Sequence, residues 1–372
     1  MMLRNDDKPT IIFAGGGHAH LYSLLRTDQM VQKGYDVVLI NPSPYLYYSG
    51  MATGVISGLY TPEEDRIDVR YLVEAGGGRF VKSRVTGVLP KDRELLLDGG
   101  ERLSYDVVSF CLGSGVDSRI DSANEDGIPV KPVENTAEIR ARIINEDPDV
   151  LVVGGGAAGC EVAANASSLI LQRGGKGRVT LAEGGPTLLD SSPEKARRGM
   201  LDHLEGRGVE VLLNTRVVSH ADGKATTLDG REILAGLLVP ATGIVPHSIF
   251  RNPQLSLLTG ADSGLWVDHH LRSVSDRRLF GGGDSISFRG GILPRLGVFA
   301  TRQGPILFHN LNATLRGETL RTYEPQNRFL YILELGDDTG LAIYGPLVCK
   351  GRAAARLKHL IDKRFMEQYR IA

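Results

Sequence analysis

A glycine-rich stretch near the middle of the chain has the spacing Gly154-x-Gly156-x-x-Gly159 and directly follows the apolar run Val150–Val153. A strand that ends in such a turn, followed by a helix whose first N–H groups are unpaired, can bind an anion, and glycine lets the backbone approach a pyrophosphate closely. Glu183 ends the next apolar run, near the roughly 20-residue separation expected for the carboxylate that holds a ribose 2′-OH. These residues predict a dinucleotide site that prefers NAD(H) to NADP(H), because a carboxylate repels a 2′-phosphate.

A second glycine-rich stretch begins at Gly15 and departs from this pattern. Gly17 is present, but His20 stands at the third glycine position and Asn41 at the acidic position. We expect His20 to keep the following helix from packing closely on its strand, and Asn41 to hydrogen-bond a ribose hydroxyl without a charge. His18, in the first turn of that helix, could donate to a phosphate. The alternative is that both histidines are ordinary helix-start residues.

The two stretches belong to a longer internal repeat. In each copy an apolar strand leads to the glycines, and a helix, a second strand with a polar end, a hairpin and a closing strand follow. The residue pairs that keep a nearly constant separation are Gly15 and Gly154, Arg84 and Arg216, Asp98 and Asp229, and Gly113 and Gly243. This regularity indicates that one β-α-β unit with an inserted hairpin occurs twice, so that two nucleotide sites lie in one chain.

Composition narrows the class of protein. Lys and Arg number 43 and Asp and Glu number 44, which gives a formal net charge of −1. This balance excludes a strongly basic nucleic-acid binder and an acidic disordered tail. No apolar stretch approaches the ~18 residues of a membrane-spanning helix, and the N-terminal residues leave no room for a secretory core. We therefore expect a cytoplasmic protein with a sizeable core, since 42% of the residues are hydrophobic.

The cysteines are few and widely spaced. Cys111, Cys160 and Cys349 form no CxxC or similar short loop. The sequence therefore predicts neither a metal site nor a local dithiol centre, and buried structural thiols are the expected role.

Further motifs connect the repeat to a known superfamily. With the doubled glycine motif, Ala241-Thr242-Gly243 and the segment 279–284, Leu-Phe-Gly-Gly-Gly-Asp, resemble the FAD-dependent pyridine nucleotide–disulfide oxidoreductase superfamily. Narrower segments resemble its type II NADH dehydrogenase-like branch, within it a subgroup often encoded beside, or fused to, selenophosphate synthetase. These segments are 15–20, 48–51, 297–305 and 357–366.

The resemblance implies an α/β fold of two Rossmann-like dinucleotide-binding domains, the glutathione-reductase-like FAD/NAD(P)-binding fold. The FAD domain would be split into 1–121 and 241–322, around an NAD(H) domain at 122–240. Residues 323–372 would form a small C-terminal α+β cap. In the FAD domain, a helix is expected over 298–311, with a kink or a later start because of Pro305.

The resemblance also implies roles for single residues. The residues expected to contact FAD are Gly15, Gly17, His18, Asn41 and Asp284, and those expected to contact NAD(H) are Gly154, Gly156, Gly159 and Glu183. Ala19, Gly113, Gly243 and Gly283 are further candidates for binding a cofactor. Asp284 would bind the ribitol chain of the flavin, with a helix N-cap as the structural alternative. Lys131 is expected to be a solvated linker residue, with a position near the flavin as the alternative.

Two residues are the catalytic candidates. Glu161 resembles the family's glutamate near the nicotinamide–flavin contact, although a carboxylate in the first turn of a helix also suits the helix dipole. Gln303 would contact the flavin, near a helix N-terminus that stabilises negative charge on it, and an exposed glutamine is the alternative.

The resemblance implies hydride transfer from NADH to FAD. Because the chain lacks the cysteine pair of the disulfide reductases, electrons would pass directly to an external acceptor, a quinone or a quinone-like molecule. One alternative is a sulfide:quinone oxidoreductase-like enzyme, in which Cys160 and Cys349 would have to meet across the flavin. The other is a non-turnover flavin redox partner or sensor linked to selenium metabolism.

The C-terminal stretch is predicted to form a hairpin, over 329–335 and 341–344, and then a basic amphipathic helix. Its basic residues are Lys350, Arg352, Arg356, Lys358, Lys363, Arg364 and Arg370, and its apolar stripe is Leu357, Leu360, Ile361, Phe365 and Tyr369. Such a helix suits peripheral contact with the inner face of an anionic membrane. Packing on the protein's own body or on a second copy of the chain is the alternative.

Overall fold

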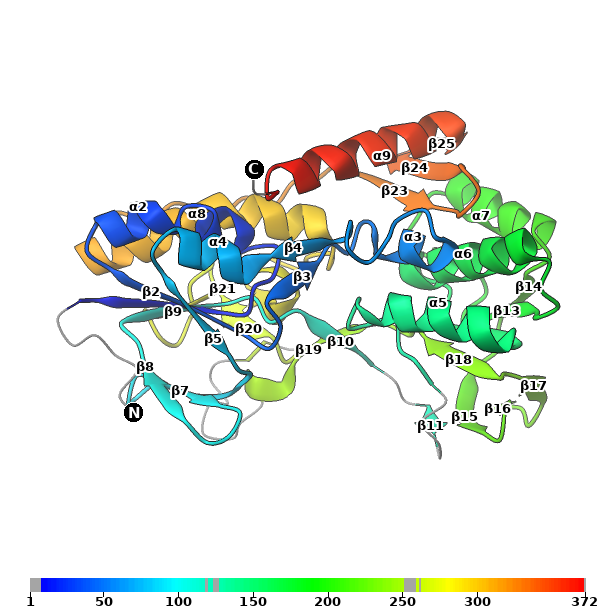
Figure 1. The fold of residues 1–372 in the computed structure, drawn as a ribbon, viewed down its shortest axis with the longest axis horizontal. Coiled ribbons are helices and arrows are strands. Elements are labelled where there is room, and N and C mark those ends of the chain that lie inside the picture. Colours follow the sequence, from blue (N-terminus) through cyan, green and yellow to red (C-terminus); the bar gives the residue numbers. More distant parts are fainter. Residues whose placement is uncertain (1–7, 118–119, 123–126, 251–258, 261, 371–372) are drawn as a thin grey trace.

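The computed structural model describes residues 8–117, 120–122, 127–250, 259–260 and 262–370. A five-stranded parallel sheet, in the order β21-β9-β1-β2-β5, forms the centre of the first part of the molecule (Figure 1). Its strands are β1 (Thr10–Ala14), β2 (Asp36–Asn41), β5 (Arg79–Lys82), β9 (Val107–Phe110) and β21 (Leu279–Gly281). Strands buried on both faces read as continuous apolar runs, and β1 and β9 are buried along their whole length.

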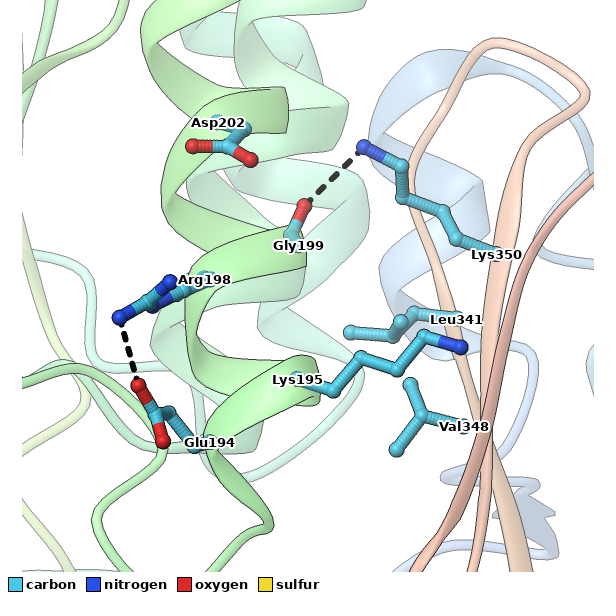
Figure 2. A pocket seen from close by; sticks show the side chains of 8 residues that line it. All are labelled: Glu194, Lys195, Arg198, Gly199, Asp202, Leu341, Val348 and Lys350. Carbon is cyan, nitrogen blue, oxygen red and sulfur yellow. Dashed lines mark hydrogen bonds and ion pairs between the residues drawn. The ribbon is translucent and has the colours of Figure 1, made fainter.

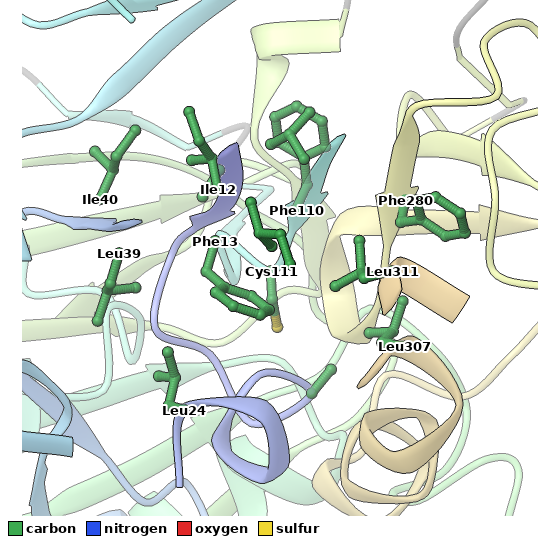
Figure 3. Packing of buried hydrophobic residues seen from close by; sticks show 14 of the residues in the cluster. Ile12, Phe13, Leu24, Leu39, Ile40, Phe110, Cys111, Phe280, Leu307 and Leu311 are labelled. Carbon is green, nitrogen blue, oxygen red and sulfur yellow. The ribbon is translucent and has the colours of Figure 1, made fainter. Parts of the chain in front are cut away.

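Helices pack on one side of this sheet. They are α1 (Leu21–Leu24), α2 (Thr27–Gln32), α4 (Val69–Ala75) and α8 (Gly297–Arg316). Figure 3 shows the core between the sheet and these helices, in which Phe13, Leu24, Cys111 and Leu307 lie close together. An antiparallel sheet of β6 (Val85–Leu89), β7 (Glu94–Leu97) and β8 (Arg102–Ser104) forms the hairpin insertion of the first copy.

The second copy repeats this plan. Its parallel sheet has the order β14-β13-β12-β18, with strands β12 (Val150–Val153), β13 (Val179–Ala182), β14 (Glu210–Leu212) and β18 (Leu237–Pro240). Its helices are α5 (Asn135–Glu146), α6 (Ala157–Arg173) and α7 (Glu194–Gly206). Its antiparallel insertion is formed by β15 (Val217–Ala221), β16 (Lys224–Thr227) and β17 (Glu232–Leu234), and β11 (Asp121–Ser122) pairs with β15.

The predicted repeat is confirmed in the pairing of the strands. The glycine-bearing strand lies between the second and the closing strand in both copies. The N–H of Gly15 donates to Ile40 O, and the N–H of Gly154 donates to Ala182 O, at the same 2.8 Å. The strands that leave the two copies, β10 (Ser114–Val116) and β19 (Ile244–Pro246), pair antiparallel and join the two parts.

The C-terminal residues form a three-stranded antiparallel sheet and a helix. The elements are β23 (Leu330–Glu334), β24 (Gly340–Tyr344), β25 (Leu347–Gly351) and α9 (Arg352–Glu367). The sequence predicts the first two strands and misses β25. In Figure 1, α9 lies along the top of the molecule and runs from this sheet back over the first part.

Shorter elements complete the fold. They are α3 (Ala52–Ser57), β3 (Tyr45–Tyr47) paired with β4 (Arg66–Asp68), β20 (Leu265–Val267) paired with β22 (Ile286–Phe288), and the 3-10 turns at Ser248–Phe250 and Gly283–Ser285. None of the helices in the described part of the chain is long and apolar enough to cross a membrane.

Helix α8 differs from the expectation for its start. It begins at Gly297 and continues to Arg316 with Pro305 inside it, so the later start is wrong. Proline removes one backbone hydrogen bond from a helix. Burial of Gln303, Gly304 and Leu307 around that turn offsets the loss.

Helix α9 is amphipathic in an unexpected way. Phe365 and Tyr369 pack against the core, as the apolar stripe predicts, but Leu357, Leu360 and Ile361 are exposed. Lys358 and Asp362 lie on the buried face instead, and their side chains are 6% and 4% exposed. A helix that packs on its own protein normally buries apolar residues and exposes charged ones. In α9 this arrangement is partly reversed.

Candidate active site

The first glycine-rich turn is shaped by close approaches that only glycine allows. Gly15 has φ +88°, and a Cβ built on it or on Gly17 would overlap Cys111. The N–H of Gly16 donates to Asn41 Oδ1 at 2.9 Å, which fixes Asn41 at the edge of the turn. Burial raises the pKa of the Cys111 thiol to about 12, so this thiol stays neutral.

His20 takes a structural role that the sequence left open. Its Nδ1 lies 2.6 Å from Gly15 O and its Nε2 lies 2.8 Å from Ser109 Oγ. Because a carbonyl oxygen only accepts, Nδ1 carries the proton and Nε2 accepts from Ser109. The imidazole is fully buried, and burial lowers its pKa to about 4. It thus bridges the turn and β9, at the position where the second copy uses a glycine.

His18 brings an unpaired nitrogen to the same turn. Its Nε2 is buried without a hydrogen-bond partner, and burial lowers the pKa of the imidazole to about 4. The ring lies 5.7 Å from that of Tyr48, which stacks on Phe365 of α9 at 4.4 Å. The neutral imidazole is therefore enclosed between the glycine turn and the C-terminal helix.

The second glycine-rich turn follows the same construction. Gly154 has φ +115°, and a Cβ on it would overlap the carbonyl oxygen of Ala241. A Cβ on Gly159 would overlap the carbonyl oxygen of Gly154, whereas Gly156 faces open space. Glu183 accepts from the N–H of Gly155 at 2.5 Å. Glu183 thus occupies the place that Asn41 holds in the first copy.

Asp284 lies beside the first turn in a small charged group. Its Oδ2 accepts from Lys131 Nζ at 2.7 Å and from Ser114 Oγ at 2.6 Å. Burial opposes ionisation of this carboxyl, but the charge and hydrogen bond of Lys131 keep its pKa below the ordinary value. The expectation that Lys131 is a solvated linker residue is wrong, because Lys131 pairs with Asp284 and its side chain is only 20% exposed. The N-cap alternative is wrong, because Asp284 lies inside the 3-10 turn Gly283–Ser285 and a strand, β22, follows it.

Gln303 is buried rather than exposed. It is 1% exposed, and its Oε1 accepts from the N–H of Gly283 at 2.7 Å. It therefore holds the turn that carries Asp284. Ala19 is fully buried, and a Cβ on Gly282 would come within 2.8 Å of its methyl group.

Glu161 projects from α6 into a buried polar cluster. Its Oε1 accepts from the N–H of Glu334 at 2.7 Å and from Thr53 Oγ1 at 3.4 Å. Burial raises the pKa of Glu161 to about 7, although the Lys358 ammonium opposes this rise. A carboxyl that titrates near neutral pH can hold or release a proton under physiological conditions.

Lys358, Asp362 and Glu334 were missed as members of this cluster. Lys358 Nζ donates to Asp362 Oδ2 at 2.6 Å and to the carbonyl oxygen of Gly50. Glu334 is 1% exposed. The sequence placed Lys358 among the basic residues of an exposed helix face. The available signal was an i, i+4 Lys–Asp pair within a stripe of apolar residues.

Gly113 and Gly243 follow the closing strands β9 and β18. Gly113 and Gly243 have φ +76° and +128°, and no atom lies within 4 Å of a Cβ built on either. Cys160 is fully buried and its Sγ lies 3.4 Å from Gly155 O, while Cys349 is exposed on β25, and all the cysteines are free. Cys160 and Cys349 therefore form no disulfide with each other.

A separate hollow lies between α7 and the C-terminal sheet (Figure 2). Leu341 and Val348 form its apolar side, and Glu194 pairs with Arg198 at its rim. Lys350 Nζ donates to Gly199 O at 3.2 Å. It contains none of the predicted site residues.

The residues of the first turn fit a bound FAD. The turn holds the unpaired His18 nitrogen, which can donate to a phosphate and has Asp284 as a charged neighbour, and its glycines let the backbone pack directly against Cys111. The model of the pyridine nucleotide-disulphide oxidoreductase family matches residues 9–304. The chain belongs to this family. It is an FAD-dependent oxidoreductase that uses a pyridine nucleotide, and its fold is the predicted pair of Rossmann-like units.

Relatives agree with this assignment, and solved structures share the fold. The chain is 25% identical to an alternative NAD(P)H-ubiquinone oxidoreductase C1 of Arabidopsis thaliana, over 96% of this chain and 78% of the relative. It is 26% identical to the demethylphylloquinone reductase NdbB of Synechocystis sp., over 93% and 91%. The NDH2 structure of Plasmodium falciparum in complex with NADH superposes with a TM-score of 0.80 at 16% identity, over 96% and 95% of the two chains. The sulfide:quinone oxidoreductase structure of Aquifex aeolicus gives 0.82 at 15%, over 97% and 91%.

Proposed function

We propose that this enzyme oxidises NADH and passes the electrons through FAD directly to a quinone, without a redox-active disulfide. One observation carries the proposal: two glycine turns of equal construction lie on either side of a buried acid–base cluster, and no pair of cysteines bridges them. Relatives that cover most of the chain are named quinone oxidoreductases, among them the type II NADH:quinone oxidoreductase of Haemophilus influenzae.

The chain's own groups perform binding and proton chemistry at this site. FAD, when bound, accepts hydride from the nicotinamide and delivers electrons to the acceptor. The turn at Gly15 and the pair of Asp284 and Lys131 hold the flavin side, with Gln303 as a positioning residue. The turn at Gly154 holds the nicotinamide nucleotide. Glu161 holds a proton near the junction of the two halves. We assign 1–121 with 241–322 to the flavin domain, 122–240 to the NAD(H) domain and 323–372 to the cap.

Glu183 is the residue that selects NADH. Its carboxylate is fixed by the N–H groups of Gly155 and Gly185, where it can accept from a ribose hydroxyl but repels a phosphate. We expect Glu183→Ala to raise KM for NADH about tenfold and to reduce discrimination against NADPH, since a charge-assisted hydrogen bond contributes roughly 1.5–3 kcal/mol. Steady-state kinetics with both nucleotides measures this effect. Equal use of NADPH by the unaltered enzyme would contradict the role of Glu183.

The exposed face of α9 suits peripheral contact with a membrane, from which a quinone could be taken. The exposed Leu357, Leu360 and Ile361 lie on a helix whose exposed positions also carry several Lys and Arg side chains. Such a surface binds anionic lipid, in which quinones dissolve. We expect the enzyme to co-sediment with anionic vesicles, and serine at all three positions to weaken this binding at least severalfold. If the parent enzyme does not bind vesicles but forms a dimer, the three exposed apolar residues contact a second copy of the chain instead.

Turnover distinguishes the proposed enzyme from a redox sensor. The flavin-loaded protein, supplied with excess NADH and a soluble quinone, is expected to oxidise many equivalents of NADH per flavin. A sensor would consume one equivalent and then stop. Absorbance of NADH under anaerobic conditions measures the difference.

A further inference from the structure

A connected series of polar groups leads from the surface to the buried cluster. His359 of α9 has 34% of its side chain exposed, and its Nε2 lies 3.3 Å from Oε2 of Glu334, whose side chain is 1% exposed. The other carboxylate oxygen of Glu334 accepts from the N–H groups of Leu335 and Gly336. These two bonds fix the carboxylate so that Oε2 points to His359.

Glu334 is also joined to the catalytic candidate. Its backbone N–H donates to Glu161 Oε1, so the strand that carries Glu334 forms one wall around Glu161. Lys358, one residue before His359 on the same helix, is the cation that opposes the raised pKa of both carboxyls. Asp362 completes the cluster through its ion pair with Lys358.

The remaining groups that face the cluster come from the segments around α3. The ring of Tyr60 lies 5.7 Å from that of His359, edge to face, and its hydroxyl lies 3.4 Å from Asp362 Oδ2. Asp65 is buried, with Lys358 and Asp362 as its charged neighbours. Tyr48 also interacts with Asp362. His359 has 34% of its side chain exposed, whereas the side chains of Glu334, Lys358 and Asp362 are 1%, 6% and 4% exposed.

The proposed reaction requires an entry for protons. NADH delivers two electrons and one proton, whereas reduction of a quinone to a quinol consumes two electrons and two protons. One proton per turnover must therefore come from solvent, because NADH + H⁺ + quinone gives NAD⁺ + quinol. Since the acid–base groups near Glu161 are buried, this proton needs a path of side chains or water.

We propose that His359 and Glu334 form the proton-entry path of this enzyme, an inference that rests on the proposed function. The His359 imidazole takes a proton from solvent at its exposed side and passes it from Nε2 to Glu334 Oε2. Glu334 then holds the proton as an electrostatic neighbour of Glu161, and His359 takes up the next one. No bond other than those to the proton forms or breaks. Burial raises the pKa of Glu334, which suits a carboxyl that must hold a proton.

His359→Gln tests the path, because glutamine can hydrogen-bond Glu334 but cannot titrate. Anaerobic stopped flow measures the two half-reactions separately. We expect flavin bleaching by NADH to stay within about twofold of the parent rate. Reoxidation by a soluble quinone is expected to slow about tenfold at pH 8, within the range of a lost general acid–base group. Exogenous imidazole should restore the rate of His359→Ala in a concentration-dependent way. Glu367→Gln, at an exposed position of the same helix, serves as the control.

A spectroscopic readout is independent of turnover. In infrared difference spectra of the enzyme before and after NADH addition, we expect a protonated-carboxyl band that is missing in Glu334→Gln. Quinone reoxidation at the parent rate in His359→Gln, without a response to imidazole in His359→Ala, would overturn the path, as would an unchanged carboxyl band in Glu334→Gln. If the parent enzyme itself does not reduce quinones, the proposed function is wrong, and this result is distinct from failure of the proton path alone.

Discussion

Gly159→Ala is expected to abolish reduction by NADH at ordinary nucleotide concentrations while the protein keeps its FAD. A Cβ at this position would overlap the carbonyl oxygen of Gly154, so the first turn of α6 must move away from its strand. Overpacking of this kind costs about 1–3 kcal/mol or more, and here it would displace the N–H groups to which we assign the pyrophosphate. A loss of about 100-fold in NADH affinity corresponds to about 2.7 kcal/mol.

Anaerobic titration of the flavin absorbance with NADH measures this loss. Gly206→Ala is the matched control, because a Cβ on Gly206 at the end of α7 meets no atom within 4 Å. FAD content should remain near that of the parent in both variants, since the flavin turn lies in the other copy. Loss of FAD together with normal NADH binding in Gly159→Ala would show that the two turns are assigned the wrong way round.

Asp65→Asn is expected to stabilise the protein at alkaline pH. Asp65 is 1% exposed, its Oδ1 has no hydrogen-bond partner, and burial raises its pKa to about 8. The folded carboxyl therefore retains its proton at pH values where the unfolded one has lost it. Stability is highest below the unfolded pKa of about 4 and declines as pH rises through the folded pKa. At pH 9 the penalty is on the order of 5 kcal/mol, and asparagine removes it because it cannot ionise.

Urea unfolding of the flavin-loaded protein between pH 5 and 9 measures the effect. The midpoint of the parent should fall with pH more steeply than that of Asp65→Asn, and the difference should grow toward pH 9. Asp92→Asn, at an exposed position, should follow the parent. Parallel midpoints of parent and Asp65→Asn across this range would show that Asp65 is ionised at little cost in the folded protein.

Local patterns sufficed to predict the two nucleotide turns. Each depends on a strand, a few glycines and a polar residue at the end of the next strand, all close in sequence. Asn41 and Glu183 accept from equivalent N–H groups, those of Gly16 and Gly155, whereas their contact with a ribose stays a prediction. The spacing of these residues reflects backbone geometry, which is why a single sequence reveals it.

The acid–base cluster could not be predicted in the same way. Lys358 of this cluster and Lys131 beside Asp284 are surface-type residues by composition, yet Lys358 is buried and Lys131 is partly buried because distant segments cover them. Lys131 meets Asp284, 153 residues away, and Lys358 meets the carbonyl of Gly50 across 308 residues. The buried charges and exposed leucines of α9 could not be predicted for the same reason. A hydrophobic periodicity shows which residues share a helix face, but it does not show which distant segment covers that face.

The proposed function requires that NADH reduce a flavin held by the first glycine turn. Anaerobic addition of NADH to the purified, flavin-loaded protein tests this claim most directly. The flavin absorbance is predicted to bleach with close to one equivalent of NADH per flavin and to recover when a soluble quinone is added. A protein that binds no flavin, or whose flavin stays yellow under excess NADH, would contradict the account.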